Sequence, residues 1–280
     1  MAPPDVLSED GIRTALSHGH DDWLECLDVF ATIDSTNDWL ASQTPPAVGR
    51  IAVAVADYQS RGRGRRGRRW EIPPGHGLCL SVGRFLPVVP ERIPALTLAS
   101  GVAVAEGLER LGVDRVLLKW PNDLVLRDGK LGGILSEIVS HGVSGVHVVV
   151  GVGLNVTLPD GFEIPGGHPG WGRGPASIAE ALAPPPLRDA LAASLIESLQ
   201  AAFDSFESDG LAGFVSRWRE RDWLRGQQVT VGDGEGETAG VAAGIAGDGT
   251  LCVDTDAGRR HIVAGDILRC RPDAPKGTDA

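Results

Sequence analysis

The spacing of apolar and polar positions divides the chain into two parts of different texture. In the first part, short apolar runs of strand length alternate with stretches in which apolar residues recur at helical spacing. The predicted strands are 51–56, 78–82, 116–118, 133–139 and 146–152. The predicted helices are 94–111, which ends before a glycine, and 187–206, which follows three prolines. Strands mixed with helices in this way indicate an α+β fold.

The pattern changes near Leu224. Beyond it, four short strands are predicted between Gly and Asp turns, at 228–231, 239–246, 250–254 and 259–264. Regular short strands with glycine between them favour a small antiparallel barrel. We therefore expect two domains, 23–223 and 225–271. Residues 1–22 and 272–280 are predicted to be polar tails, and the Gly- and Pro-rich segment 161–174 a loop.

Composition and charge narrow the class of protein. The 280 residues carry a formal net charge of -11, with a pI near 5.1. Such an acidic chain argues against general nucleic-acid binding, because phosphate contacts need a basic surface. The four cysteines are scattered without a Cys-x-x-Cys pair, which argues against a zinc site and a disulfide framework. We see no signal peptide and no apolar run near the roughly 20 residues of a membrane helix, so we expect a cytoplasmic protein with reduced thiols.

One segment departs from this acidic background. Residues 61–69, here called the arginine loop, contain six arginines and three glycines and are followed by Trp70. Arginine forks bind carboxylate and phosphate oxygens bidentately, and glycines let the backbone approach a ligand. Because the loop lies between two predicted strands, we favour an active-site loop that closes on an anion. A solvated loop, or a tether for nucleic acid, is the alternative.

Other polar motifs follow the predicted strands and helices. Lys119-Trp-Pro-Asn-Asp123 comes after a strand, where a lysine can act as a fixed charge for a reacting phosphate. For this motif taken alone, a turn whose Asn122 and Asp123 satisfy the backbone is the favoured explanation. Ser35 and Asp38 match a helix capping box, and a helix start also offers donors to a polar ligand. The glycine motifs at 130–137 and 151–155 are typical of close strand packing.

Taken in order, these motifs resemble the biotin–protein ligase family. The shared pattern runs from a Ser-Thr-Asn helix start through Gln59, the arginine loop and Lys-Trp-Pro-Asn-Asp to the two glycine motifs, which end at Asn155. The C-terminal segment resembles the SH3-like barrel of the same family, notably at 240–245 and 263–267. The resemblance covers nearly the whole chain, and the arginine loop together with Lys-Trp-Pro-Asn-Asp is its most specific part.

The resemblance implies a mixed-sheet catalytic domain like that of class II aminoacyl-tRNA synthetases. It also implies two half-reactions. The carboxylate of biotin attacks the α-phosphate of ATP to give biotinyl-5′-AMP and pyrophosphate. A lysine of a biotin carboxyl carrier protein then attacks the adenylate to give an amide and AMP. ATP and biotin are the substrates, and Mg²⁺ is expected as the counter-ion of the phosphates, with no ligand assigned.

The resemblance also implies roles for individual residues. The biotin-binding set is Ser35, Thr36, Asn37, Gln59, Arg63, Gly64, Arg65 and Lys119. The set for ATP and the adenylate is Arg65, Arg66, Arg68, Trp70, Asn122 and Asn155. Lys119 and Arg65 are the expected catalytic residues, Lys119 by stabilising charge that develops during adenylation. Loop closure would also shield the acyl-adenylate from water.

The chain departs from the family pattern in two places. The segment before Ser35 is too short for the winged helix-turn-helix found in many bacterial relatives, so we expect no DNA binding. Residues 175–178 read Pro-Ala-Ser-Ile where relatives often have Ala-Thr-Ser-Leu. Two other functions remain open. One is a lipoate or octanoate ligase or transferase of the same fold, and the other is a non-catalytic module that binds biotin or a nucleotide.

Overall fold

A computed structural model describes all residues except 1–4, 89–92, 143–144, 163–173, 235 and 272–280. Its main sheet has seven strands in the order β1-β2-β3-β7-β6-β5-β4. These strands are β1 (Leu24–Ile33), β2 (Ile51–Gln59), β3 (Gly77–Leu86), β4 (Leu117–Lys119), β5 (Asp123–Leu126), β6 (Gly129–Gly142) and β7 (Gly145–Asn155). Only β1 and β2 run parallel, and the other neighbours are antiparallel. The sheet is therefore mixed, as predicted.

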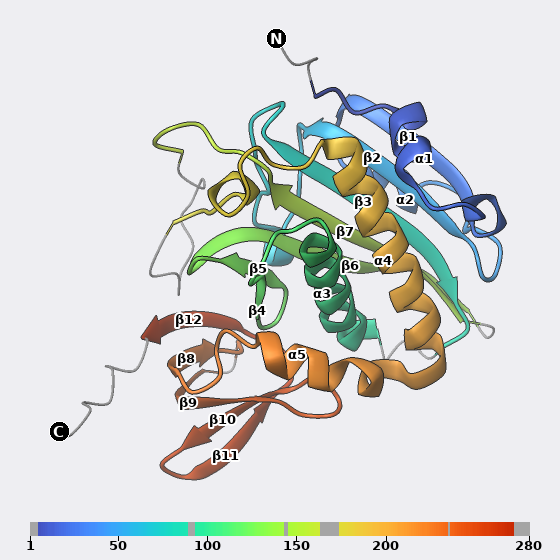
Figure 1. Ribbon diagram of the computed structural model, residues 1–280. Helices are drawn as coiled ribbons and strands as arrows, with labels where there is room; N and C mark the ends of the chain where they lie inside the picture. Colours follow the sequence, from blue (N-terminus) through green and yellow to red (C-terminus); the bar gives the residue numbers. More distant parts are fainter. Residues whose placement is uncertain (1–4, 89–92, 143–144, 163–173, 235, 272–280) are drawn as a thin grey trace.

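Two long helices cover one face of the main sheet, and a short one packs on the other (Figure 1). The long helices are α3 (Ile93–Arg110) and α4 (Arg188–Asp209), and the short one is α2 (Thr36–Ala41). Strand β2 shows the division by its period of two. Ile51, Val53 and Val55 belong to the large core under the long helices, whereas Ala52 and Ala54 pack with Leu40 of α2. The small alanines leave room for α2 close to the strand.

The segment 1–22 contradicts the prediction of a polar tail over its described part. It contains α1 (Glu9–Ala15), capped by the side chain of Ser8. Ile12 and Leu16 are buried in the large core, and Ser8 donates two hydrogen bonds to Asp189 of α4. The sequence analysis missed this helix because seven residues hold too few apolar positions to show a helical period.

The C-terminal part folds as a second, five-stranded antiparallel sheet in the order β11-β10-β9-β8-β12. Its strands are β8 (Gln228–Gly232), β9 (Glu237–Ile245), β10 (Leu251–Thr255), β11 (Gly258–Ile262) and β12 (Asp266–Arg271). The first four match the predicted strands, and β12 was not predicted. Helix α5 (Val215–Arg221) leads into this sheet and lies beside it (Figure 1). The predicted loop 161–174 lies mostly outside the described residues.

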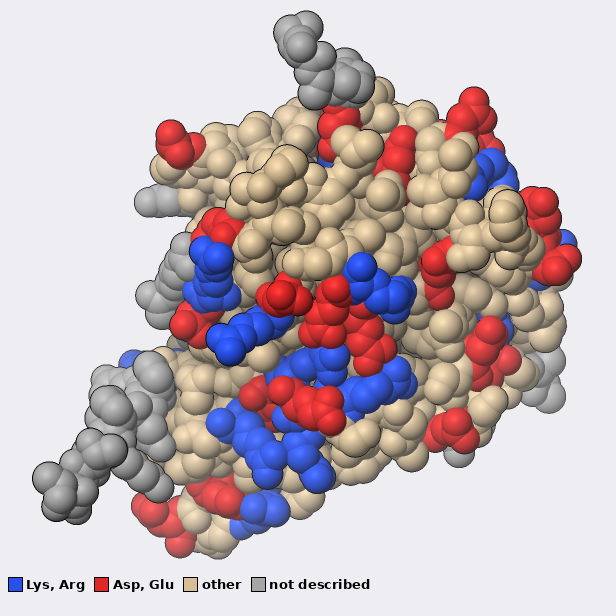
Figure 2. Space-filling view, viewed as in Figure 1, with Lys and Arg blue, Asp and Glu red and all other residues tan. Residues whose placement is uncertain are grey.

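The visible surface around α5 carries both signs of charge side by side (Figure 2). Arg217 pairs with Glu106 and Arg221 with Glu109, which joins α5 to α3. On this face, basic groups are thus interspersed with acidic ones. No helix in the described part of the chain is both long and apolar enough to cross a bilayer.

Candidate active site

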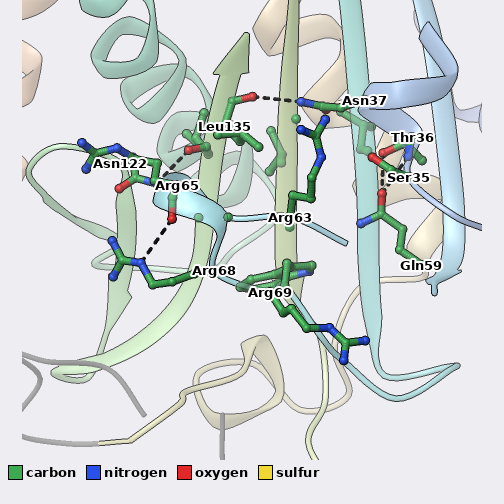
Figure 3. A pocket seen from close by; sticks show the side chains of 18 of the residues that line it. Ser35, Thr36, Asn37, Gln59, Arg63, Arg65, Arg68, Arg69, Asn122 and Leu135 are labelled. Carbon is green, nitrogen blue, oxygen red and sulfur yellow. Dashed lines mark hydrogen bonds between the residues drawn. The ribbon is translucent and has the colours of Figure 1, made fainter. Parts of the chain in front are cut away.

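A polar pocket lies on the α2 face of the main sheet, beside the arginine loop (Figure 3). The residues that line it include most of the predicted site. They are Ser35, Thr36, Asn37, Gln59, Arg63, Gly64, Arg65, Arg68, Arg69, Trp70, Leu80, Asn122, Asp123, Lys130, Gly133, Ile134, Leu135, Gly151, Val152 and Gly153. Segments far apart in the sequence therefore converge on one cavity, as the order of the motifs predicted.

The end of the pocket at α2 is a network of buried hydrogen bonds. Ser35 caps the helix, its hydroxyl accepting from the backbone N–H of Asp38 as the capping box predicted. The backbone N–H and the hydroxyl of Thr36 both donate to Gln59 Oε1, at 2.7 and 3.0 Å. Thr36 and Asn37 also meet Ser81 of β3, at 2.7 and 2.6 Å between oxygens. Such a network fixes which polar atoms face the cavity.

Glu137 of β6 connects this network to the arginine loop. Its carboxylate accepts from Asn37 Nδ2 at 2.7 Å and pairs with Arg63 at 3.1 Å. Arg63 also contacts the carboxylate of Asp38. Sequence reasoning missed Ser81, which belongs to no motif, and gave no role to Glu137, although Glu137 ends the motif at 130–137. Their role appears only when the strands are assembled.

The glycines of the 151–155 motif make space for two site residues. A Cβ atom at Gly151 would lie 2.2 Å from Asn37 Oδ1, and one at Gly153 would lie 2.4 Å from Cε2 of Trp70. Both glycines therefore let a side chain of the site rest directly on the backbone of β7. The motif serves more than the close packing of strands.

The arginine loop is an ordered turn in the described structure, which argues against a solvated tether. Arg63 and Arg69 form a backbone bridge, and the N–H of Gly64 donates to the carbonyl of Arg68 at 2.6 Å. The turn itself includes Arg66, which has a φ of 55°. Arg65 and Arg68 point along the pocket wall (Figure 3), while Arg66 lies outside the described lining.

The lysine in the pocket is Lys130, in the glycine motif at 130–137, and not Lys119. Lys130 is 7% exposed and its Nζ lies 2.7 Å from Asp123 Oδ1 in the pocket wall. Lys119 is 2% exposed, its Nζ lies 5.9 Å from the Trp223 ring, and it falls outside the described lining. Burial lowers the pKa of Lys119 to about 8. The role that the sequence analysis gave Lys119 therefore fits Lys130 better.

Asn155 also lies outside the described lining, but it holds Lys130 in place. Its buried side-chain amide donates to the carbonyls of Lys130, at 3.2 Å, and Ala176, at 2.9 Å. The backbone N–H of Ala176 donates in turn to the Lys130 carbonyl at 2.9 Å. Asn122 does line the pocket, and its amide donates to the carbonyl of Ile134 at 2.8 Å.

The pocket carries a surplus of positive charge. Four arginines and Lys130 line it, against Asp123 as the one carboxylate in its described lining. Burial lowers the pKa of the Arg65 guanidinium from its ordinary value, although Asp266 opposes this shift. A guanidinium stays charged in proteins. The pocket thus suits a ligand with a polar end, which the α2 network would hold, and a strongly anionic end.

Comparisons with known proteins agree with this geometry. Residues 29–155 match the model of the Biotin/lipoate A/B protein ligase family, and residues 225–269 match the Biotin protein ligase C terminal domain. The chain is 32% identical to a biotin--[acetyl-CoA-carboxylase] ligase of Mycobacterium tuberculosis, across 97% of this chain and 98% of the relative. It is 35% identical to the bifunctional ligase/repressor BirA of Salmonella typhimurium, across 95% of this chain and 79% of the relative.

A solved structure of a biotin protein ligase also resembles this chain. The biotin protein ligase of Aquifex aeolicus in complex with biotin and ATP superposes with a TM-score of 0.69 at 25% identity, covering 89% of this chain and 99% of that one. The two family models match in order along the chain, and relatives above 30% identity align over most of their length. The chain belongs to the biotin protein ligase family.

Proposed function

We propose that this protein activates biotin with ATP and transfers it to a lysine of a biotin carboxyl carrier protein. The observation that carries the proposal is the pocket itself. It joins an uncharged hydrogen-bonding end at α2 to a cationic end made by the arginine loop and Lys130. Biotin has the matching form, with a neutral ureido ring at one end and a carboxylate at the other.

The α2 network would bind the ureido ring. Gln59, Thr36, Asn37 and Ser35 present amide and hydroxyl groups to the cavity, and Arg63 closes over them from the loop. These groups offer donors to a carbonyl and acceptors to N–H groups. The buried network is held from behind by Ser81 and Glu137, so little rearrangement would be needed when the ring binds.

The cationic end would carry out adenylation. A carboxylate oxygen of biotin attacks the α-phosphorus of ATP, the bond from that phosphorus to the oxygen shared with the β-phosphate breaks, and pyrophosphate leaves. The negative charge that develops on the phosphoryl oxygens would lie near Lys130, Arg65 and Arg68, which line this end of the pocket. Fixed cations in a partly buried wall stabilise that charge without having to reorient. Trp70 and Asn122 also line the pocket and would contact the nucleotide.

Transfer is the second step. The neutral amine of the carrier lysine attacks the acyl carbon of biotinyl-AMP, the bond to the AMP oxygen breaks, and the amine loses a proton. AMP leaves with the charge that Lys130 and Arg65 stabilised before. The carrier partner follows from relatives named for acetyl-CoA carboxylase, an enzyme whose biotin is protein-bound.

Mg²⁺ is expected to arrive with the nucleotide. Among the described residues, no cluster of three or more His, Cys, Asp or Glu side chains is placed to hold a metal. Mg²⁺ commonly keeps water and phosphate ligands with one or two carboxylates. Asp123 is the carboxylate that the pocket offers, so the site fits an ion held mainly by the triphosphate. The ion would offset phosphate charge.

The experiment that tests the proposal is exchange of labelled pyrophosphate into ATP, with biotin, lipoate and octanoate as separate acids. Exchange that depends on biotin alone supports the proposed function. Exchange with lipoate or octanoate instead would make the protein a ligase for those acids. A folded protein that supports no exchange with Mg²⁺ and any of the three acids would be a non-catalytic binder.

A further inference from the structure

The C-terminal sheet presents one carboxylate to the arginine loop. Asp266 begins β12, where its neighbour Ile267 is buried in the core of that sheet and Asp266 turns away from it. Three loop arginines converge on it. The distances from guanidinium nitrogen to carboxylate oxygen are 3.5 Å for Arg65, 3.1 Å for Arg66 and 2.8 Å for Arg68. Asp266 thus joins segments about 200 positions apart in the sequence.

Asp266 contacts these arginines from outside the described lining of the pocket. Arg65 and Arg68 line the cavity, whereas Asp266, although described, lies outside its described lining. Arg65 also donates to the carbonyl of Gly265 at 3.3 Å, so it is held by two groups of the C-terminal sheet. The same two guanidiniums can therefore face a ligand in the pocket while Asp266 holds their other side. A carboxylate placed to compete with the ligand would lie in the cavity instead.

The loop conformation needs such an anchor. Three guanidiniums at one point repel each other, and one carboxylate compensates only one of their three charges. Arg66 also has a left-handed backbone, with a φ of 55°, which is unfavourable for a residue other than glycine. Its ion pair with Asp266 helps to offset that cost. Without Asp266, we expect the loop to open and the arginines to move apart.

We infer that Asp266 is a positioning residue, through which the C-terminal sheet holds the arginine loop ready for the triphosphate. This inference rests on the proposed function for its kinetic part, since the anion is taken to be ATP. The two uncompensated positive charges then face the pocket, where the nucleotide phosphates can neutralise them. The polar network at α2 makes no contact with Asp266, so binding of biotin should depend on Asp266 less than binding of ATP does.

Two measurements test this on Asp266→Asn in the full chain. The first is limited trypsin digestion of the ligand-free protein, with cleavage after Arg65, Arg66 and Arg68 followed by mass spectrometry. Trypsin cleaves a rapidly fluctuating loop in proportion to the fraction of time that the loop is open, so we expect cleavage in the loop to be at least about fivefold faster. The second is pyrophosphate exchange, in which we expect KM for ATP to rise about tenfold and KM for biotin to rise by a clearly smaller factor.

Matched variants separate positioning from a general structural effect. Asp254→Asn removes another carboxylate of the C-terminal sheet, bound to Arg259 at 2.7 Å, and should change neither measurement. Asp266→Glu keeps the charge and should restore most of the wild-type behaviour. If Asp266→Asn does not unfold cooperatively in urea, the same two measurements are made on Asp266→Ser.

Each other outcome overturns the inference. Unchanged cleavage in the loop would show that Asp266 does not hold it. A lower KM for ATP would show that Asp266 competes with the nucleotide. The digestion needs no activity, so it gives a result even if the wild-type protein fails to exchange pyrophosphate. That failure would refute the proposed function and leave the anchoring of the loop to be judged by proteolysis alone.

Discussion

Replacing Lys130 with methionine tests the reassignment of the catalytic lysine. Methionine keeps most of the packing of the buried stem but removes the ammonium group, which is 2.7 Å from Asp123. Loss of one preorganised electrostatic group typically lowers kcat about 10²–10³-fold, or about 3–4 kcal/mol. We expect a loss of this size here, because no ammonium group at position 130 would then offset the negative charge of Asp123 beside the reacting phosphate.

The assay is single-turnover formation of biotinyl-AMP at saturating ATP and biotin. Asp123→Asn combined with Lys130→Met removes both charges of this ion pair, so it should recover stability in urea without recovering the rate. Lys119→Met is the matched control, because it removes a neighbouring buried lysine that lies outside the described lining. We expect it to slow adenylation less than about tenfold. A near-normal rate for Lys130→Met, with a large loss for Lys119→Met, would refute the reassignment.

Three further variants probe other parts of the site and fold. Arg65→Gly should release biotinyl-AMP and label lysines of a bystander protein, measured by blotting for biotin, and clean labelling of the carrier alone would contradict its retention role. Gly151→Ala should raise KM for biotin more than about tenfold, because its Cβ would displace Asn37; an unchanged KM would remove Asn37 from the biotin site. Burial raises the pKa of Asp222 to about 6 in the folded state, from an ordinary value of 3.8. Between these two values the folded protein keeps a proton on Asp222 that the unfolded chain has lost. The free energy of unfolding therefore falls as the pH rises through 6. Asp222→Asn should therefore be more stable than the wild type in urea at pH 7, by up to about 3 kcal/mol, and should lose this advantage by pH 4; an advantage that does not change with pH would refute the shift.

The spacing of apolar residues predicted the central, buried strands correctly but missed the edge strand β1 and the short helices. The strands at 51–56, 78–82 and 146–152 are central and buried on both faces, so they appear as continuous apolar runs. Strand β1 pairs on one side only and alternates with polar residues, and it was not predicted. Helices α1 and α5 are short and rich in charge, and tertiary contacts decide their state.

The motifs indicated which segments form the site but not which side chain of each segment faces it. Lys119 and Lys130 both lie in motifs with good chemistry, and only the pairing of β4, β5 and β6 places Lys130 in the wall. Arg66 and Arg65 are neighbours in the same loop, and the turn directs only one into the pocket lining. Asp266 lies in the matching segment 263–267, but that segment indicated no role for it, since its role comes from a contact between the two sheets.

The central claim is that this chain joins biotin to a carrier lysine through an adenylate. The most direct measurement is a reaction with biotin, ATP, Mg²⁺ and a biotin carboxyl carrier domain. The biotinylated carrier, AMP and pyrophosphate are quantified in the same reaction. The account predicts one biotinyl group on a single carrier lysine by mass spectrometry, with one AMP and one pyrophosphate formed for each. Modification by lipoate instead of biotin, release of ADP, or no modification by folded protein would contradict it.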